Sequence, residues 1–312
     1  MCWPEWCGRA RSASSSTWRS PRSNGGCSPG RPSTAGAAHD RAATPLGAAR
    51  RLPRTLALRL GVPVVAVVLW QLAARARGSV FFPTPARIVE HGYHLWFSGP
   101  AERAFLTDAA VRDLLPSLGR VLAGFALAAA GGIVLGLALG RSRTVYALCD
   151  PVLQFARAVP PPALVPVFVV VFDLGTPMQL ASIVFGAIWP VLINTAEGVR
   201  GIDPLRLDVA ATVRMRPAER IVLLYLPAAL PRIFAGLRLS LSLSLILMVF
   251  SELLPGTADG IGFSLTDAQT RSDLLTVWAV MVLLGALGHL LNSALLAVER
   301  LALGRHRAAH RT

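Results

Sequence analysis

The sequence of 312 residues contains no lysine, so all of its 31 basic residues are arginine. It therefore has no phosphate-binding loop that ends in Gly-Lys, and it also has no HExxH, CxxC or GxSxG motif. These absences predict a chain that is not an enzyme, with no catalytic residues and no metal or cofactor. If ATP drives its activity, hydrolysis must occur on a separate chain.

Cysteine is scarce as well, and three of the four cysteines (Cys2, Cys7 and Cys27) lie in residues 1–50. Lone cysteines without a CxxC pair or histidine partners rarely form a metal or redox site. Serine, glycine, proline and arginine dominate these fifty residues, and no helical or strand period is present. We expect a disordered tail here, although a misassigned translation start explains the segment equally well.

Charged residues are scarce as well. Only 15% of residues are charged, 53% are hydrophobic, and the mean hydropathy is +0.52. Residues 121–140, 174–196 and 274–298 are uncharged stretches of about the length that crosses a bilayer as a helix. Shorter apolar runs occupy residues 60–74, 158–172 and 239–251. The pattern predicts an all-α, polytopic membrane bundle of about six transmembrane helices, with five as the fallback.

The net charge of +14 is distributed unevenly along the chain. Arginines concentrate in residues 1–59, 141–143, 200–232 and 300–311, which fall on one side of the membrane if successive loops alternate. This is the positive-inside pattern, so we expect both termini in the cytoplasm and no nucleic-acid partner. Residues 75–116 fit less well, because they are assigned outside but carry several arginines balanced by acids.

Small residues recur at four-residue intervals in the apolar run 121–140, at Ala128, Gly132, Gly136 and Gly140. This spacing places them on one face of a helix, where another helix can approach closely. We therefore expect them to pack against a neighbouring helix, with a flexible hinge as the alternative.

Three consecutive prolines, Pro160 to Pro162, lie near the start of the apolar run 158–172, and Pro166 follows them. Proline removes a backbone donor and bends a helix interior. The prolines either start this helix at the cytoplasmic side or bend it beside a transport pathway.

Ionisable residues near the membrane interior are few; the candidates are Arg157, Arg238 and His289. The two arginines can reach the interface by snorkelling, and the histidine can be hydrogen-bonded between helices. No span contains paired carboxylates, which argues against a proton-coupled transporter.

Residues 198–231 form an unusually long polar segment between two apolar spans, with Pro204 near its start and Pro227 near its end. The segment predicts two short surface helices, 205–213 and 218–226, with Asp208 capping the first or pairing with a basic residue. Such a segment is typical of a docking element for another protein. The alternative is a long basic loop that has no partner.

Residues 82–300 resemble the inner-membrane permeases of ATP-binding-cassette (ABC) importers, particularly the nitrate, sulfonate and taurine group. The motifs occur in the family's order: residues 82–85 (FPTP), 115–125 (LPSLGRVLAGF), 150–151 (DP), 159–166 (VPPPALVP), 172–175 (FDLG), 189–195 (WPVLINT) and 198–204 (GVRGIDP). The resemblance implies a MetI-like core of five helices. It divides the chain into a tail (1–50), a first helix with an amphipathic extracytoplasmic linker (51–115), the permease domain (116–300) and a basic cytoplasmic tail (301–312).

The same resemblance makes residues 208–227 the "EAA" loop, which couples such permeases to their ATPase. The residues that occupy its positions here are Asp208, Val209, Ala210, Arg214, Arg216, Pro217, Leu226 and Pro227. Arg214 stands where the family has glycine, and Pro217 can take over part of the chain-breaking role of that glycine.

The resemblance implies a permease subunit in the inner membrane of a prokaryote, forming a homodimer that works with two ATPase subunits and an extracytoplasmic solute-binding protein. Its substrate would be a small anion such as a sulfonate, taurine or nitrate. Two alternatives are an ATP-independent transporter or channel, and a membrane scaffold that recruits partners through residues 198–231.

Overall fold

The regular elements of residues 51–309, the part described by the computed structural model, are helices without strands, as predicted. The prediction for residues 1–50 lies outside this part. Residues from Leu58 onward form one unit. The elements are α2 (Arg51–Arg77), α3 (Pro85–Trp96), the 3-10 turn η1 (Ala101–Arg103), the π turn η2 (Ala110–Leu114), α4 (Leu115–Gly140), α5 (Arg143–Ala158), α6 (Pro161–Phe172), α7 (Thr176–Arg200), α8 (Pro204–Thr212), α9 (Pro217–Arg220), the π turn η3 (Ile221–Tyr225), α10 (Leu226–Glu252), α11 (Ile261–Thr270) and α12 (Leu274–Ala309).

Four helical segments are long and apolar enough to cross a membrane: Ala110–Gly140, Thr176–Arg200, Pro217–Glu252 and Leu274–Gly304. The count becomes five if α5 and α6, which are bent by 88° relative to each other, form one broken span. This agrees with the fallback of five, while α2 as a sixth span stays a prediction.

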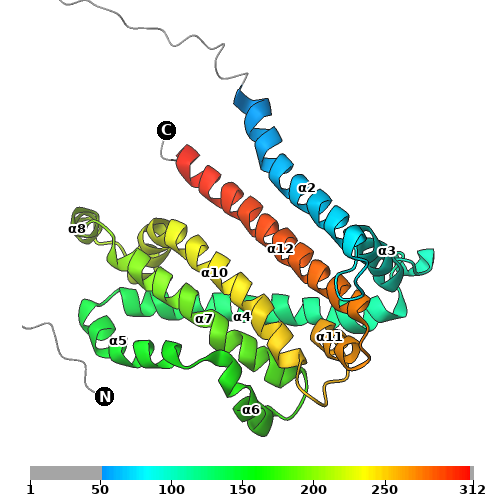
Figure 1. The fold of residues 1–312 in the computed structure, drawn as a ribbon. Helices are drawn as coiled ribbons and strands as arrows, with labels where there is room; N and C mark the ends of the chain where they lie inside the picture. Colours follow the sequence, from blue (N-terminus) through cyan, green and yellow to red (C-terminus); the bar gives the residue numbers. More distant parts are fainter. Residues whose placement is uncertain (1–50, 310–312) are drawn as a thin grey trace, which may run out of the picture. The chain divides into compact units, whose positions relative to one another are not determined.

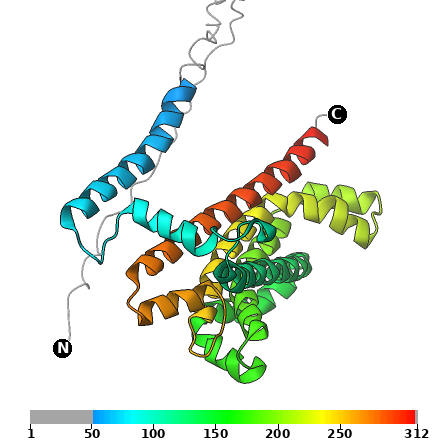
Figure 2. The same cartoon turned by 90° about the vertical axis from the view of Figure 1, so that its right-hand side faces the viewer.

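Helix α7 lies at the centre of the bundle, where it packs extensively against both α4 and α10 (Figure 1). Helix α12 packs against α3, α10 and α11, and Figure 2 shows α3 beside the N-terminal part of α12. The short helix α8 lies at one end of the bundle and α11 at the other (Figure 1). The chain therefore presents two structured ends, each joined to the same central helices.

The contact between α4 and α7 depends on the small residues of α4. Ala128, Gly132, Gly136 and Gly140 are all buried on one face. A Cβ atom at Gly136 would lie 2.6 Å from the carbonyl oxygen of Leu192, and one at Gly132 would lie 2.7 Å from Val191 Cβ. Real Cβ atoms do not approach other heavy atoms this closely, so the two helices need glycine at these positions.

The proline run starts α6. Pro160 is the N-cap and Pro161 the first residue of the helix, where a missing N–H has no cost. The α6 helix has 12 residues and spans about 18 Å, which is less than the roughly 30 Å hydrocarbon core. The helix therefore begins at the prolines, as the first alternative predicts, and the chain bends by 88° just before it. The cytoplasmic side of this start and a nearby transport pathway stay predictions.

One expectation about the long polar segment is wrong. Residues 218–226 do not form a separate surface helix, because Pro217–Glu252 is one continuous helix of 36 residues. Pro227 cannot donate a backbone hydrogen bond, and the helix accommodates it by widening into the π turn η3 just before it. There the Leu226 N–H donates to the Ile221 carbonyl, five residues earlier.

Candidate functional site

The segment between α7 and α10 leaves the bundle where these two helices are in close contact, and this contact forms its base. Arg232 Nη1 on α10 donates to Glu197 Oε2 on α7 at 2.7 Å. Gly198 packs so tightly against α10 that a Cβ atom would lie 2.9 Å from Ala229 Cβ. Val199 and Ala229 continue the contact as part of a buried apolar cluster. The base therefore fixes where the segment emerges.

The start of α8 is set by Asp203 and Pro204. The Asp203 side chain accepts a hydrogen bond from the Leu205 N–H at 3.0 Å, and Pro204 is the first helical residue. The expectation that Asp208 caps this turn is wrong, because Asp208 lies in the middle of α8. Its exposed carboxylate makes no ion pair with the side chains of residues 61–304.

The backbone at the end of α8 shows why glycine would fit position 214, where the resemblance expects it. The Met215 N–H donates to the Ala210 carbonyl at 3.1 Å, and the Arg214 N–H donates to the Ala211 carbonyl at 3.0 Å. These two bonds form a Schellman motif, which requires a left-handed residue after the helix. Arg214 is that residue, with φ of 51°. The departure from the family pattern keeps the backbone geometry at the cost of local strain.

We expect Arg214→Gly to raise the free energy of unfolding by about 1 kcal/mol, because glycine adopts the left-handed conformation without a steric penalty. Thermal unfolding of the purified protein would measure the change. Arg216→Gly is the matched control, since Arg216 has φ of −63° and gains nothing from glycine. Equal stabilisation by both variants, or by neither, would contradict the assignment.

The outward surface of α8 carries an apolar stripe: the exposed fractions of Leu205, Val209 and Val213 are 67%, 55% and 63%. The stripe borders a groove of about 340 Å³ between α8 and the start of the long helix, which Met215 and Leu223 also line. Three large aliphatic side chains in one exposed row suit contact with another surface better than contact with water.

The remaining residues of the predicted coupling loop lie on α8 itself and in the first part of the long helix. Ala210 is buried, and Arg220 Nη2 lies 3.5 Å from its carbonyl oxygen. Pro217 begins α9 after the N-cap Arg216, whose N–H donates to Glu219 Oε2 at 2.9 Å. Leu226 and Pro227 are half-buried in the long helix.

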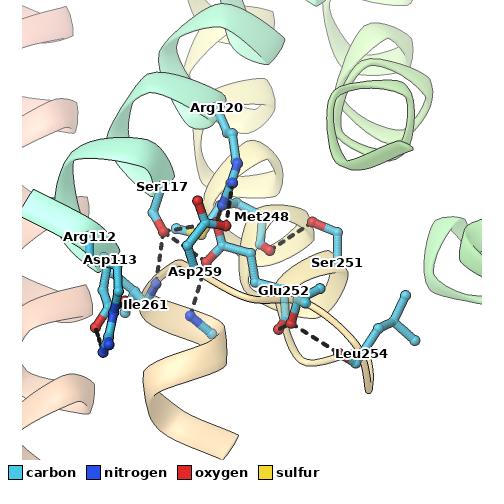
Figure 3. A network of polar contacts seen from close by, with 12 residues as sticks. Arg112, Asp113, Ser117, Arg120, Met248, Ser251, Glu252, Leu254, Asp259 and Ile261 are labelled. Carbon is cyan, nitrogen blue, oxygen red and sulfur yellow. Dashed lines mark hydrogen bonds and ion pairs between the residues drawn. The ribbon is translucent and has the colours of Figure 1, made fainter. Parts of the chain in front are cut away.

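A buried polar network lies at the opposite end of the bundle (Figure 3). Arg120 of α4 donates from Nη1 to Glu252 Oε1 of α10 at 2.8 Å, and from Nη2 to Asp259 Oδ1 at 2.7 Å. Ser117 Oγ lies 2.8 Å from both Glu252 oxygens. Glu252 is fully buried and Arg120 is 6% exposed, whereas Asp259 is 39% exposed.

The loop before α11 completes this network through its backbone. The Gly262 N–H donates to Glu252 Oε2 at 3.0 Å, and the Ile261 N–H donates to Ser117 Oγ at 2.8 Å. Gly260 has φ of 113°, and a Cβ atom there would lie 2.5 Å from Glu252 Oε2. A buried ion pair needs such additional hydrogen bonds to offset desolvation. The network therefore ties α11 to the ends of α4 and α10.

This network was not predicted from the sequence. Arg120 and Glu252 each lie near the end of an apolar run, so each resembles an ordinary interfacial charge. The available signal was Ser117 one helical turn before Arg120, together with the glycines at 260 and 262 shortly after Glu252. Of the arginines that were considered, Arg238 pairs with Glu299 of α12, and Arg157 is exposed at the end of α5.

These features define an integral membrane protein whose four or five spans carry an exposed apolar helix on a fixed base. A family profile, the binding-protein-dependent transport system inner membrane component, matches residues 132–302. The chain belongs to this family and is a transmembrane permease subunit of an ABC importer. The resemblance seen in the sequence is thereby confirmed, while the domain boundaries drawn from it stay predictions.

Three relatives show how far the similarity extends. The bicarbonate transport system permease CmpB of Synechococcus elongatus is 34% identical over 75% of this chain and 84% of its own length. The nitrate import permease NrtB of Synechocystis is 31% identical over 76% and 86%. The taurine transport system permease TauC of Escherichia coli is 29% identical over 80% and 90%.

Proposed function

We propose that the chain forms, as a homodimer, the membrane pathway for a small oxygen-rich anion, and that residues 198–231 couple it to two ATPase subunits. A soluble binding protein delivers the anion at the extracytoplasmic end. The chain itself carries out no catalysis.

The geometry of α8 is the observation that supports this coupling role most strongly. The helix presents Leu205, Val209 and Val213 outward, while its base is held by the Glu197–Arg232 ion pair and the Gly198 contact. A helix on a fixed base moves with α7 and α10 as one body, so displacement by a closing ATPase dimer would rock the central helices.

The substrate class rests on the names of the relatives, which are permeases for bicarbonate, nitrate and taurine. These solutes share a small anionic oxygen-bearing group. A small anion is therefore the substrate class that we propose, with a sulfonate, taurine or nitrate as the candidates.

The orientation follows from charge. The end that carries α8 includes the arginine-rich segment 200–232, so we place it in the cytoplasm together with both termini. The end that carries Glu252, Asp259 and α11 then faces outward, in the inner membrane of a prokaryote.

Arg214 does not favour the alternative of a membrane scaffold without transport activity. The residue occupies the left-handed position with both Schellman hydrogen bonds formed, so α8 ends as a glycine-containing loop would end. The geometry that a coupling helix needs is retained.

Reconstitution tests the proposal. The full chain, the ATPase subunit encoded nearest to it and the corresponding binding protein would be placed in proteoliposomes with radiolabelled taurine, nitrate or bicarbonate. We expect uptake that requires ATP on the α8 side and the binding protein on the other. Uptake driven by an ion gradient without ATP would contradict the proposal.

A further inference from the structure

A polar cavity of about 460 Å³ lies where α2 ends and where α3 and α12 begin. Figure 2 shows the chain turning from α2 into α3 close to the N-terminal part of α12. The polar side chains that line the cavity are Arg75, Ser79, Thr84, Arg87, Ser272 and Asp273. Neither the coupling segment nor the Arg120 network includes any of them.

The lining has an excess of one positive charge. Arg75 and Arg87 are exposed and form no ion pair with the side chains that the structure describes. Asp273 is already engaged, because its carboxylate accepts from Thr276 Oγ1 at 2.6 Å and from the Thr276 N–H at 3.2 Å. Hydrogen bonding from Thr276 lowers the pKa of Asp273, which keeps this carboxylate ionised. The two arginines carry one more charge than Asp273 neutralises, so a ligand with a single negative charge would make the lining neutral.

Aromatic and aliphatic side chains surround the cavity. Val80, Phe81 and Phe82 are 79%, 69% and 50% exposed. The Trp278 ring lies 5.3 Å from that of Trp70 and 6.2 Å from that of Phe82, and Trp278 Nε1 donates to the Phe81 carbonyl at 3.1 Å. Aromatic residues of this kind gather at the membrane–water boundary, where lipid headgroups lie. The cavity therefore opens at headgroup depth.

The arginines of this region are also the ones that the topology does not explain. In the orientation proposed above they lie on the extracytoplasmic side, where the positive-inside bias disfavours them. A negatively charged ligand at this boundary would account for their position. Planar guanidinium groups suit phosphate oxygens in particular, because they can donate two parallel hydrogen bonds.

We propose that this cavity binds the phosphodiester headgroup of an anionic phospholipid, with Arg75 and Arg87 holding the phosphate. The acyl chains lie along the apolar surface of α2, where Val65, Leu69 and Leu72 are 57%, 61% and 57% exposed. The site includes no residue of the coupling segment. It can therefore be tested without a transport assay.

The test measures lipid binding to the full chain purified in detergent, by native mass spectrometry during titration with phosphatidylglycerol. We expect Arg75→Gln/Arg87→Gln to lower the affinity about thirtyfold, which corresponds to about 2 kcal/mol at about 1.4 kcal/mol per tenfold change. Arg77→Gln is the control for a change of charge at the end of α2, since it removes one arginine there but Arg77 does not line the cavity. This control should bind like the wild type.

Two further titrations separate the possible ligands. Phosphatidylcholine, which is zwitterionic, should bind more weakly than phosphatidylglycerol, and inorganic phosphate at the same concentration should not compete. Equal affinity of the wild type and the double variant, or an equal loss with Arg77→Gln, would overturn the site. Competition by inorganic phosphate would instead identify a site for soluble anions and would overturn the lipid assignment.

Discussion

Replacing Arg120 by leucine is expected to lower the free energy of unfolding by about 3–5 kcal/mol, because it leaves the buried Glu252 carboxylate without its cation. Glu252 is fully buried, and the remaining donors, Ser117 and the Gly262 N–H, are neutral. Thermal unfolding of the purified protein in detergent, read by the fluorescence of its tryptophans, would measure the loss.

The double variant Arg120→Leu/Glu252→Gln separates loss of the ion pair from loss of packing. If the cost arises from an unpaired buried charge, neutralising Glu252 should recover a large part of the stability. Arg271→Leu provides an exposed control, because the Arg271–Asp267 ion pair lies at the surface and should contribute little. If the double variant is less stable than Arg120→Leu alone, the proposed origin of the effect is wrong.

Introducing a carboxylate into the apolar stripe of α8 is expected to abolish coupling to the ATPase. Val209→Asp places a charge at the middle of the row formed by Leu205, Val209 and Val213, where a partner surface would have to desolvate it. The affinity for the ATPase subunit should fall by at least about thirtyfold, as expected for a central interface position. Co-purification of the two subunits and ATP-driven uptake in proteoliposomes would measure the effect.

Ala211→Asp is the matched control for this variant. Ala211 is equally part of α8 and exposed, but its position in the helix places it on the side away from the stripe. It adds the same charge to the same helix and should leave the complex intact. If both variants lose the ATPase, the helix is merely sensitive to charge. If Val209→Asp retains it, the stripe is not the interface.

Local patterns were sufficient to predict most of the spans and the small-residue face of α4. Small residues at four-residue intervals share one face of a helix, and this face of α4 lies against α7. The proline run likewise predicted the start of α6. These features depend on neighbours in the sequence, so they can be derived from it.

Features that depend on distant residues could not be predicted in this way. Arg120 and Glu252 are separated by 132 positions, and nothing local indicates that both are buried against each other. The prediction of a second surface helix over residues 218–226 was wrong because Pro227 suggests the end of a helix. In the structure, the π turn η3 accommodates this proline within one continuous helix. The left-handed conformation of Arg214 could not be predicted, because the residue type arginine does not indicate a positive φ angle.

The continuous helix from Pro217 to Glu252 has a mechanical consequence. Its 36 residues extend about 54 Å, from the segment that supports α8 to the carboxylate that holds α11. Its regular hydrogen bonding is interrupted at the wide turn of residues 221–225 and at Pro227 and Pro231, which have no backbone N–H to donate. In the orientation proposed above, one end of this helix adjoins α8 on the cytoplasmic side and the other holds α11 on the opposite side. A displacement of one end would then be transmitted along the helix to the other.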